Sequence, residues 1–87
     1  MIDAKIGCFA ISRAGHDKDK IYVILSLDGD RVMVSDGRLK TVDTPKKKSL
    51  KHLQLTNRTV NDTLLAKLRS GQPVTNEEIK YEIKHYQ

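Results

Sequence analysis

Apolar residues and turn signals alternate at short intervals through the first half of the chain, a pattern that predicts β-strands. A first strand is expected over residues 6–11, where small and apolar residues precede a glycine turn at Gly15. Residues 21–27 are rich in β-branched and aromatic types and are too apolar for a strand with one solvated face. We therefore expect residues 21–27 to form the central strand.

Two further turns follow this segment. Residues 28–30 (Asp-Gly-Asp) predict a tight hairpin, because glycine accepts the positive φ that a two-residue connection requires. Residues 31–35 alternate behind it as the return strand. A second turn is expected at residues 36–37 (Asp-Gly), followed by a short fourth strand over residues 39–42.

Past Pro45 the pattern predicts a polar, lysine-rich loop through Lys48, and the leucines behind it predict a helical turn and a closing strand. Turns that recur about every eight to twelve residues are typical of a small barrel or sandwich. We therefore expect a mainly β fold, a five-stranded SH3-like barrel whose closure removes exposed sheet edges.

After Asn57 the apolar period becomes helical. Valine and leucine at positions 60, 64, 65 and 68 mark one face of a first helix, with Thr59 or Asn61 as its N-cap and Gly71 just past its end. A T-x-x-E capping box at residues 75–78 begins a second helix with an apolar stripe at positions 79, 83 and 86. We expect this C-terminal helical hairpin, residues 58–87, to bury its stripes on the barrel of residues 1–57 or on a partner.

Cysteine content and apolar runs bear on the compartment. The single cysteine, Cys8, excludes an internal disulfide and leaves too few thiols for a structural zinc site, which indicates a reducing compartment. The N-terminal residues lack a secretory pattern, and no apolar run approaches the roughly 20 residues that span a bilayer. We expect a cytoplasmic protein that does not associate with a membrane and binds no metal or cofactor.

Charge is unevenly distributed along the chain. The net charge of +5 resides in residues 1–58, which carry twelve Lys or Arg and seven Asp, whereas residues 59–87 carry four charges of each sign. Residues 38–58 hold seven cations against one anion, Asp43. A field of this kind attracts polyanions.

The loop between the first two predicted strands carries the clearest candidate chemistry. Gly15 lets the backbone approach a phosphate, and Arg13, Lys18 and Lys20 would neutralise the charge around it. Two aspartates in the same loop offset part of this charge, so an ordinary charged hairpin loop is the alternative interpretation.

Two segments resemble sequences of known RNA-binding proteins. Residues 7–20, followed by residues 22–24 (Tyr-Val-Ile) and 36–37 (Asp-Gly), resemble the KOW motif, a strand, a glycine and a second strand. Residues 46–53, Lys-Lys-Lys-Ser-Leu-Lys-His-Leu, are similar to the lysine-rich stretch of KOW-containing large-subunit ribosomal proteins of the fourteen-e kind. The two segments occur in the family's order and cover roughly residues 5–56.

The resemblance implies an SH3-like barrel that binds ribosomal or other structured RNA through the first loop and the basic stretch before the last strand. The residues carried over are Arg13, Gly15, His16 and Lys18 in the loop and Lys46, Lys47, Lys48, Lys51 and His52 in the stretch. Charge alone adds Lys20, Arg38 and Lys40. One departure, Asp19 where many relatives have glycine, bears on the loop's conformation and on its closeness to phosphate. We expect the glycine loop to position the RNA and residues 46–51 to supply most of the affinity.

The remaining candidate residues have ordinary structural alternatives. His16 is suited equally to an RNA contact and to capping its turn, and His52 fits a barrel-lid residue better than a ligand. Cys8 has apolar strand neighbours, where a thiol is usually inert, and no catalytic constellation emerges. Aromatic residues are few, so recognition should rest on backbone charge and shape, and the tyrosines at 81 and 86 indicate helix packing.

These patterns together predict a non-catalytic RNA-binding protein linked to translation or to the large ribosomal subunit, with ribosomal RNA as the expected partner. The alternative is a KOW-type protein-interaction adaptor in transcription or translation complexes, with its protein partner on the C-terminal helices.

Overall fold

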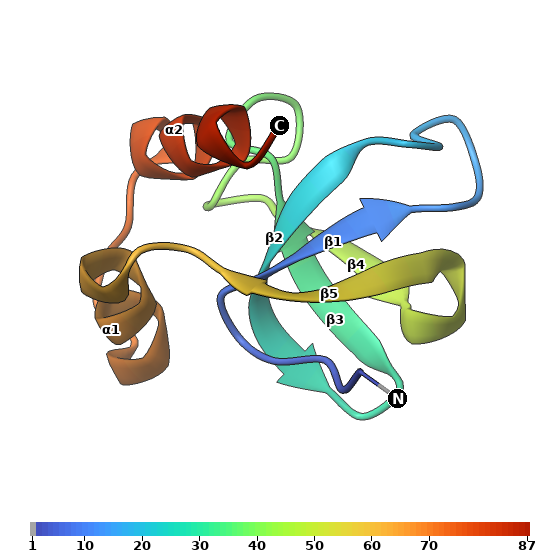
Figure 1. The fold of residues 1–87 in the computed structure, drawn as a ribbon, viewed down its shortest axis with the longest axis horizontal. Helices are drawn as coiled ribbons and strands as arrows, with labels where there is room; N and C mark the ends of the chain where they lie inside the picture. Colours follow the sequence, from blue (N-terminus) through green and yellow to red (C-terminus); the bar gives the residue numbers. More distant parts are fainter. Residues whose placement is uncertain (1) are drawn as a thin grey trace.

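A five-stranded antiparallel sheet and two C-terminal helices make up the computed structural model, which describes residues 2–87 (Figure 1). The strands are β1 (Cys8–Ser12), β2 (Ile21–Asp28), β3 (Arg31–Ser35), β4 (Lys46–Ser49) and β5 (Leu53–Thr59). A short 3-10 helix, η1 (Leu50–His52), precedes β5, and the two helices are α1 (Asp62–Ser70) and α2 (Asn76–Tyr86). The strand order β4-β3-β2-β1-β5 places β2 at the centre and confirms the mainly β, SH3-like fold.

The hairpin between β2 and β3 has the tight turn that the sequence predicts. Asp28 pairs with Arg31, so Gly29 and Asp30 alone make the connection, and Gly29 has a φ of 62°. A side chain at that φ would be strained, which explains why glycine is placed there.

The fourth strand lies elsewhere than predicted. Residues 39–42 form no strand because the side chain of Asp36 accepts hydrogen bonds from the backbone N–H groups of Arg38 and Lys40, at 2.9 and 3.0 Å, and holds a compact turn. The lysine run predicted as a loop is β4 instead, with Lys46, Lys47 and Lys48 opposite Val34, Met33 and Val32 of β3. Pairing with the open edge of β3 satisfies the backbone hydrogen-bonding groups of this polar segment, so the segment forms a strand despite its low apolar content.

The predicted closure of the barrel is also wrong, because the sheet stays open between its edge strands. Within residues 2–87, β4 pairs only with β3 and β5 pairs only with β1, and η1 bridges the two edges. Lysines along β4 protect its free edge, since charged side chains discourage pairing with another chain.

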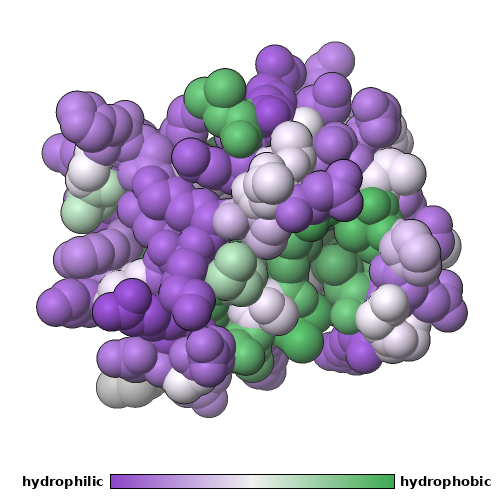
Figure 2. All heavy atoms as spheres, turned by 180° about the vertical axis from the view of Figure 1, so that it is seen from behind, coloured by the Kyte–Doolittle hydropathy of each residue, from purple (hydrophilic) through white to green (hydrophobic). Residues whose placement is uncertain are grey.

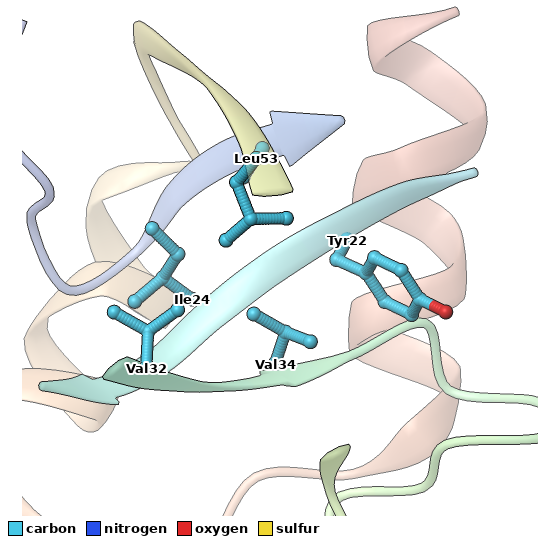
Figure 3. Packing of buried hydrophobic residues seen from close by; sticks show 6 residues of the cluster. Tyr22, Ile24, Val32, Val34 and Leu53 are labelled. Carbon is cyan, nitrogen blue, oxygen red and sulfur yellow. The ribbon is translucent and has the colours of Figure 1, made fainter. Parts of the chain in front are cut away.

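One face of the curved sheet encloses the first part of the core. Figure 3 shows Ile24, Val32, Val34 and Leu53 gathered between β2, β3 and β5. The ring of Tyr22 lies at one end of this cluster with its hydroxyl directed away from the aliphatic side chains (Figure 3). Burial of such side chains contributes roughly 1.5 to 3 kcal/mol each and is the main stabilisation of the sheet.

The other part of the core joins the helices to the sheet. Leu64 of α1 and Ile79 of α2 are buried against Phe9 and Val23, so the helical stripes pack on the strands of this chain. Gly37 permits the close approach of α2, because a Cβ atom there would lie 2.5 Å from the backbone oxygen of Asn76. Neither helix in the described part of the chain is long and apolar enough to cross a membrane.

The helix boundaries follow their predicted caps. Asn61, one of the two predicted N-caps, accepts a hydrogen bond from the Leu64 N–H at 2.9 Å, and Gly71 ends α1 with a left-handed φ of 73°. Thr75 and Glu78 form both halves of the predicted capping box of α2. Local sequence signals were sufficient at these positions because each cap involves neighbouring residues only.

Candidate functional site

The loop that joins β1 to β2 is a compact turn with two residues in the left-handed region. Gly15 has a φ of 85° and Asp19 has a φ of 71°. The Asp19 N–H donates to the carbonyl oxygen of Ser12 at 2.7 Å, and its carboxylate pairs with Arg13 at 3.0 Å. Aspartate tolerates this φ better than most residues, so the loop takes a glycine-type conformation at Asp19 without a glycine.

Asp17 is the centre of a buried polar group that ties this loop to the sheet and to β4. Its two carboxylate oxygens accept hydrogen bonds from the Tyr22 hydroxyl at 2.8 Å and the Ser12 hydroxyl at 3.0 Å. The Nζ atoms of Lys48 and Lys46 donate to the same carboxylate at 3.1 and 3.2 Å. We call Asp17 and these four partners the Asp17 cluster.

The cluster shifts the acidity of both its acidic groups. Burial by itself raises the pKa of Asp17, but the hydrogen bonds from Tyr22, Lys48, Ser12 and Lys46 together hold that pKa well below its usual range. Burial, followed by the hydrogen bond to the Asp17 carboxylate and that negative charge, raises the pKa of Tyr22. Asp17 is therefore ionised and Tyr22 protonated at neutral pH.

Lys47 and Lys48, neighbours in β4, lie on opposite faces of the strand. Lys48 is turned inward with 7% of its side chain exposed, whereas half of the Lys47 side chain is exposed on the other face of the strand. Lys47 lies 3.6 Å from the exposed carboxylate of Asp28, a distance and setting that stabilise the fold little. Lys48 is thus a structural residue, and Lys47 presents its charge to solvent.

The first loop and the basic stretch meet at one surface depression of about 560 Å³, which we call the basic hollow. Figure 1 shows the β1–β2 loop and the β4–η1–β5 segment at the end of the sheet opposite the helices, and the same end is hydrophilic from behind (Figure 2). Five cations and two anions line the hollow. These residues are Arg31, Lys46, Lys47, Lys48, Lys51, Asp17 and Asp30, and Ala14, Gly15, Ser49 and His52 complete its wall.

The basic hollow unites six of the twelve predicted site residues and adds one cation that the sequence did not suggest. The six are Gly15, Lys46, Lys47, Lys48, Lys51 and His52. Arg31 is the addition, and it reaches the hollow because it begins β3 directly opposite Ser49 of β4. The predicted hairpin placed Arg31 at the start of a strand. Its neighbours on β4 could not be predicted, because the fourth strand was expected elsewhere.

The other six predicted residues lie outside the hollow. Arg13, beside Asp19, also donates to the side chain of Gln54 of β5. His16 and Lys18 are exposed on the β1–β2 loop, and Lys40 is half-buried in the turn after β3. Lys20 and Arg38 line a different depression, beside α2.

Neither the protein-family models nor the curated proteins compared with this chain gave a match.

Other chemistry has little geometric basis in the described residues. In residues 2–87, no three His, Cys, Asp or Glu side chains are grouped to hold a metal ion. Cys8 is buried in β1, and this burial raises the pKa of its thiol despite the positive charges of Lys5 and Arg69 nearby. A buried thiol of raised pKa is a poor nucleophile at neutral pH.

Proposed function

We propose that this chain is a non-catalytic RNA-binding protein that holds structured RNA, ribosomal RNA in particular, against the basic hollow. The observation that carries the proposal is the meeting of the Gly15 loop and the lysine run of β4 at one surface with an excess of positive charge. These are also the two segments that resemble KOW-containing ribosomal proteins of the large subunit.

Within the hollow, the exposed cations at its edge would neutralise the phosphates. Arg31, Lys47 and Lys51 are exposed, and neither Arg31 nor Lys51 forms an ion pair within residues 2–87. The Asp17 cluster forms the buried floor of the hollow beneath them. There the Asp17 carboxylate partly neutralises the charges of Lys46 and Lys48. Binding should therefore depend on the charge of the RNA backbone and on the shape of the RNA, and the affinity should fall steeply with added salt.

The direct test replaces two exposed edge cations and compares an equal loss of charge elsewhere. Lys47→Gln with Lys51→Gln should weaken binding to a structured ribosomal RNA fragment at least about tenfold, since two charge-assisted contacts are lost. The matched control, Lys5→Gln with Arg69→Gln, removes two exposed cations that do not line the hollow. Equal affinity of both double variants would refute the assignment of the site.

The link to the ribosome is tested by sedimentation. Cytoplasmic protein that migrates with large ribosomal subunits at low salt, and is released at high salt, would support ribosomal RNA as the partner. Protein that stays free at both salt concentrations would contradict the ribosomal assignment while leaving other structured RNAs as targets.

The apolar stripe of α2, which motivated the adaptor alternative, packs on the sheet of this chain. Ile79 is fully buried on the sheet, and the Tyr86 ring stacks on Phe9 with ring centroids 4.4 Å apart. These side chains, which the sequence offered as a partner face, belong to the core of this chain. Deleting residues 59–87 should therefore abolish the fold and not merely remove a binding partner.

A further inference from the structure

A second depression lies on the far side of the β1–β2 loop, between that loop, the turn after β3 and α2. Its volume is about 820 Å³, within the range of roughly 300 to 1,000 Å³ typical of ligand-sized pockets. We call it the helix groove. Its cations are Lys20, Arg38, Lys80 and Lys84, and its anions are Asp19, Asp36 and Glu77.

Most of the negative charge in the helix groove is already engaged. Asp19 pairs with Arg13 at 3.0 Å, and Asp36 lies 3.6 Å from Lys20. Within residues 2–87, the other three cations of the groove form no ion pair. Within the same residues Glu77 is also unpaired, so three cations (Arg38, Lys80 and Lys84) and one carboxylate leave an excess of positive charge for an anion.

An exposed aromatic side chain lies among these cations. Tyr81 lines the groove and is 58% exposed, in contrast to Tyr86, which packs on Phe9. One side of the Tyr81 ring is covered by His85, with ring centroids 4.0 Å apart, and the His85 Nδ1 atom lies 2.9 Å from the Tyr81 carbonyl oxygen. The expectation from sequence that Tyr81 serves helix packing is therefore wrong: within residues 2–87 its one aromatic neighbour is His85, and more than half of the residue is open to solvent.

The turn that presents Arg38 is held rigidly before any ligand arrives. Asp36 accepts hydrogen bonds from two backbone N–H groups of the turn, and the Ser35 hydroxyl donates to the Lys40 carbonyl oxygen at 2.6 Å. A preformed turn loses little conformational entropy when its side chains bind.

The β1–β2 loop is a shared wall between the two depressions. Ala14, Gly15 and Asp17 line the basic hollow, and Asp19 and Lys20 line the helix groove. A strand of RNA that leaves the basic hollow would cross only this short loop, with its exposed cations, to reach Tyr81.

We propose that the helix groove binds an unpaired nucleotide of the same RNA, with its base stacked on the free face of Tyr81. Arg38, Lys80 and Lys84 contact the flanking phosphates. Exposed aromatic rings beside cations are the usual means of holding single-stranded RNA, because every base has a face to stack. This inference rests on the proposed function and narrows its ligand to structured RNA with an adjoining unpaired segment.

The test compares two RNAs that share one hairpin, of which one is blunt and the other carries an unpaired extension. Tyr81→Ala should weaken binding of the extended RNA about tenfold and leave binding of the blunt hairpin unchanged. Tyr81→Phe retains the ring and should bind both RNAs as the natural chain does. A 5-bromouridine placed in the extension should crosslink to Tyr81 in the natural chain.

The outcomes separate this inference from the proposed function. If Tyr81→Ala binds both RNAs normally while Lys47→Gln with Lys51→Gln weakens both, the basic hollow binds RNA and the helix groove does not, and the inference is overturned. If the natural chain binds neither RNA, the proposed function and this inference fail together. An equal loss for both RNAs in Tyr81→Ala, with circular dichroism unchanged, would also overturn the stacking of an unpaired base.

Discussion

The buried floor and the exposed edge of the basic hollow use the same residue type for opposite purposes. In the Asp17 cluster, Lys48 is enclosed and its charge is matched by a carboxylate 3.1 Å away. One residue earlier, Lys47 is half exposed, and its partner 3.6 Å away, the Asp28 carboxylate, is itself exposed to solvent. The difference shows that position in a lysine run predicts little, and that the direction of each side chain decides whether its charge stabilises the fold or remains available to a ligand.

The largest expected effect comes from removing the carboxylate at the centre of the cluster. Asp17→Ala leaves two lysines without their anion and the Tyr22 hydroxyl without its acceptor, although the Ser12 hydroxyl keeps the Ala14 carbonyl oxygen. The variant should lower the free energy of unfolding by about 3 to 5 kcal/mol. Urea denaturation measures the change. The control Asp28→Ala breaks only the exposed pair with Lys47 and should cost less than about 1 kcal/mol. Similar losses in the two variants would contradict the contrast between floor and edge.

The paired lysines provide the next test. Lys48→Ala should lower the free energy of unfolding by about 1 to 3 kcal/mol, because Asp17 keeps Lys46 and two hydroxyl donors but loses one buried charged partner. Lys47→Ala should change stability by less than about 0.5 kcal/mol. Thermal unfolding of both variants checks the ranking, and a Lys47→Ala variant as unstable as Lys48→Ala would show that the assigned directions are wrong.

The pH dependence of the free energy of unfolding should also originate in the Asp17 cluster. The pKa of Asp17 in the folded chain lies below its ordinary value of 3.8, so the unfolded chain binds more protons in that range. The stabilisation is therefore fully present above pH 3.8 and is lost as the pH falls through the folded-state pKa. Asp17→Asn should lose less stability than the natural chain between pH 5 and pH 2. Parallel curves for the two proteins would place the acid sensitivity elsewhere.

A small effect is also expected at Asp19, the left-handed aspartate of the β1–β2 loop. Asp19→Gly removes a conformational cost of roughly 1 kcal/mol but also gives up the pair with Arg13 and adds chain entropy, so stability should change by less than about 1 kcal/mol. RNA affinity should rise modestly at low salt, because one negative charge leaves the loop. A large fall in stability would mean that the Asp19 carboxylate holds the loop together.

Local signals in the sequence predicted much of the fold. The central strand, the hairpin at Gly29 and the capping box at Thr75 each depend on residues close together in the chain. The fourth strand was misplaced because residues 39–42 have the apolar pattern of a strand, whereas β4 is built from lysines. Pairing with β3 decided its position, and such tertiary context is absent from a local pattern.

The candidate site was predicted in outline and not in its internal arrangement. Charge density and the family resemblance identified the two segments that meet at the basic hollow. The partners of Asp17 in β4 follow it by 29 and 31 residues, and their directions depend on the register of β3 with β4. Since the sequence prediction lacked that register, it treated Lys48 and Lys47 as equivalent.

The salt dependence of RNA binding tests the central claim most directly. Affinity for a structured ribosomal RNA fragment is measured over a range of salt for the natural chain, Lys47→Gln with Lys51→Gln, and the control Lys5→Gln with Arg69→Gln. The edge variant should lose about 1.4 to 1.8 of the slope of log affinity against log salt, since each phosphate contact contributes roughly 0.7 to 0.9, and the control should keep the natural slope. An unchanged slope in the edge variant would contradict the account.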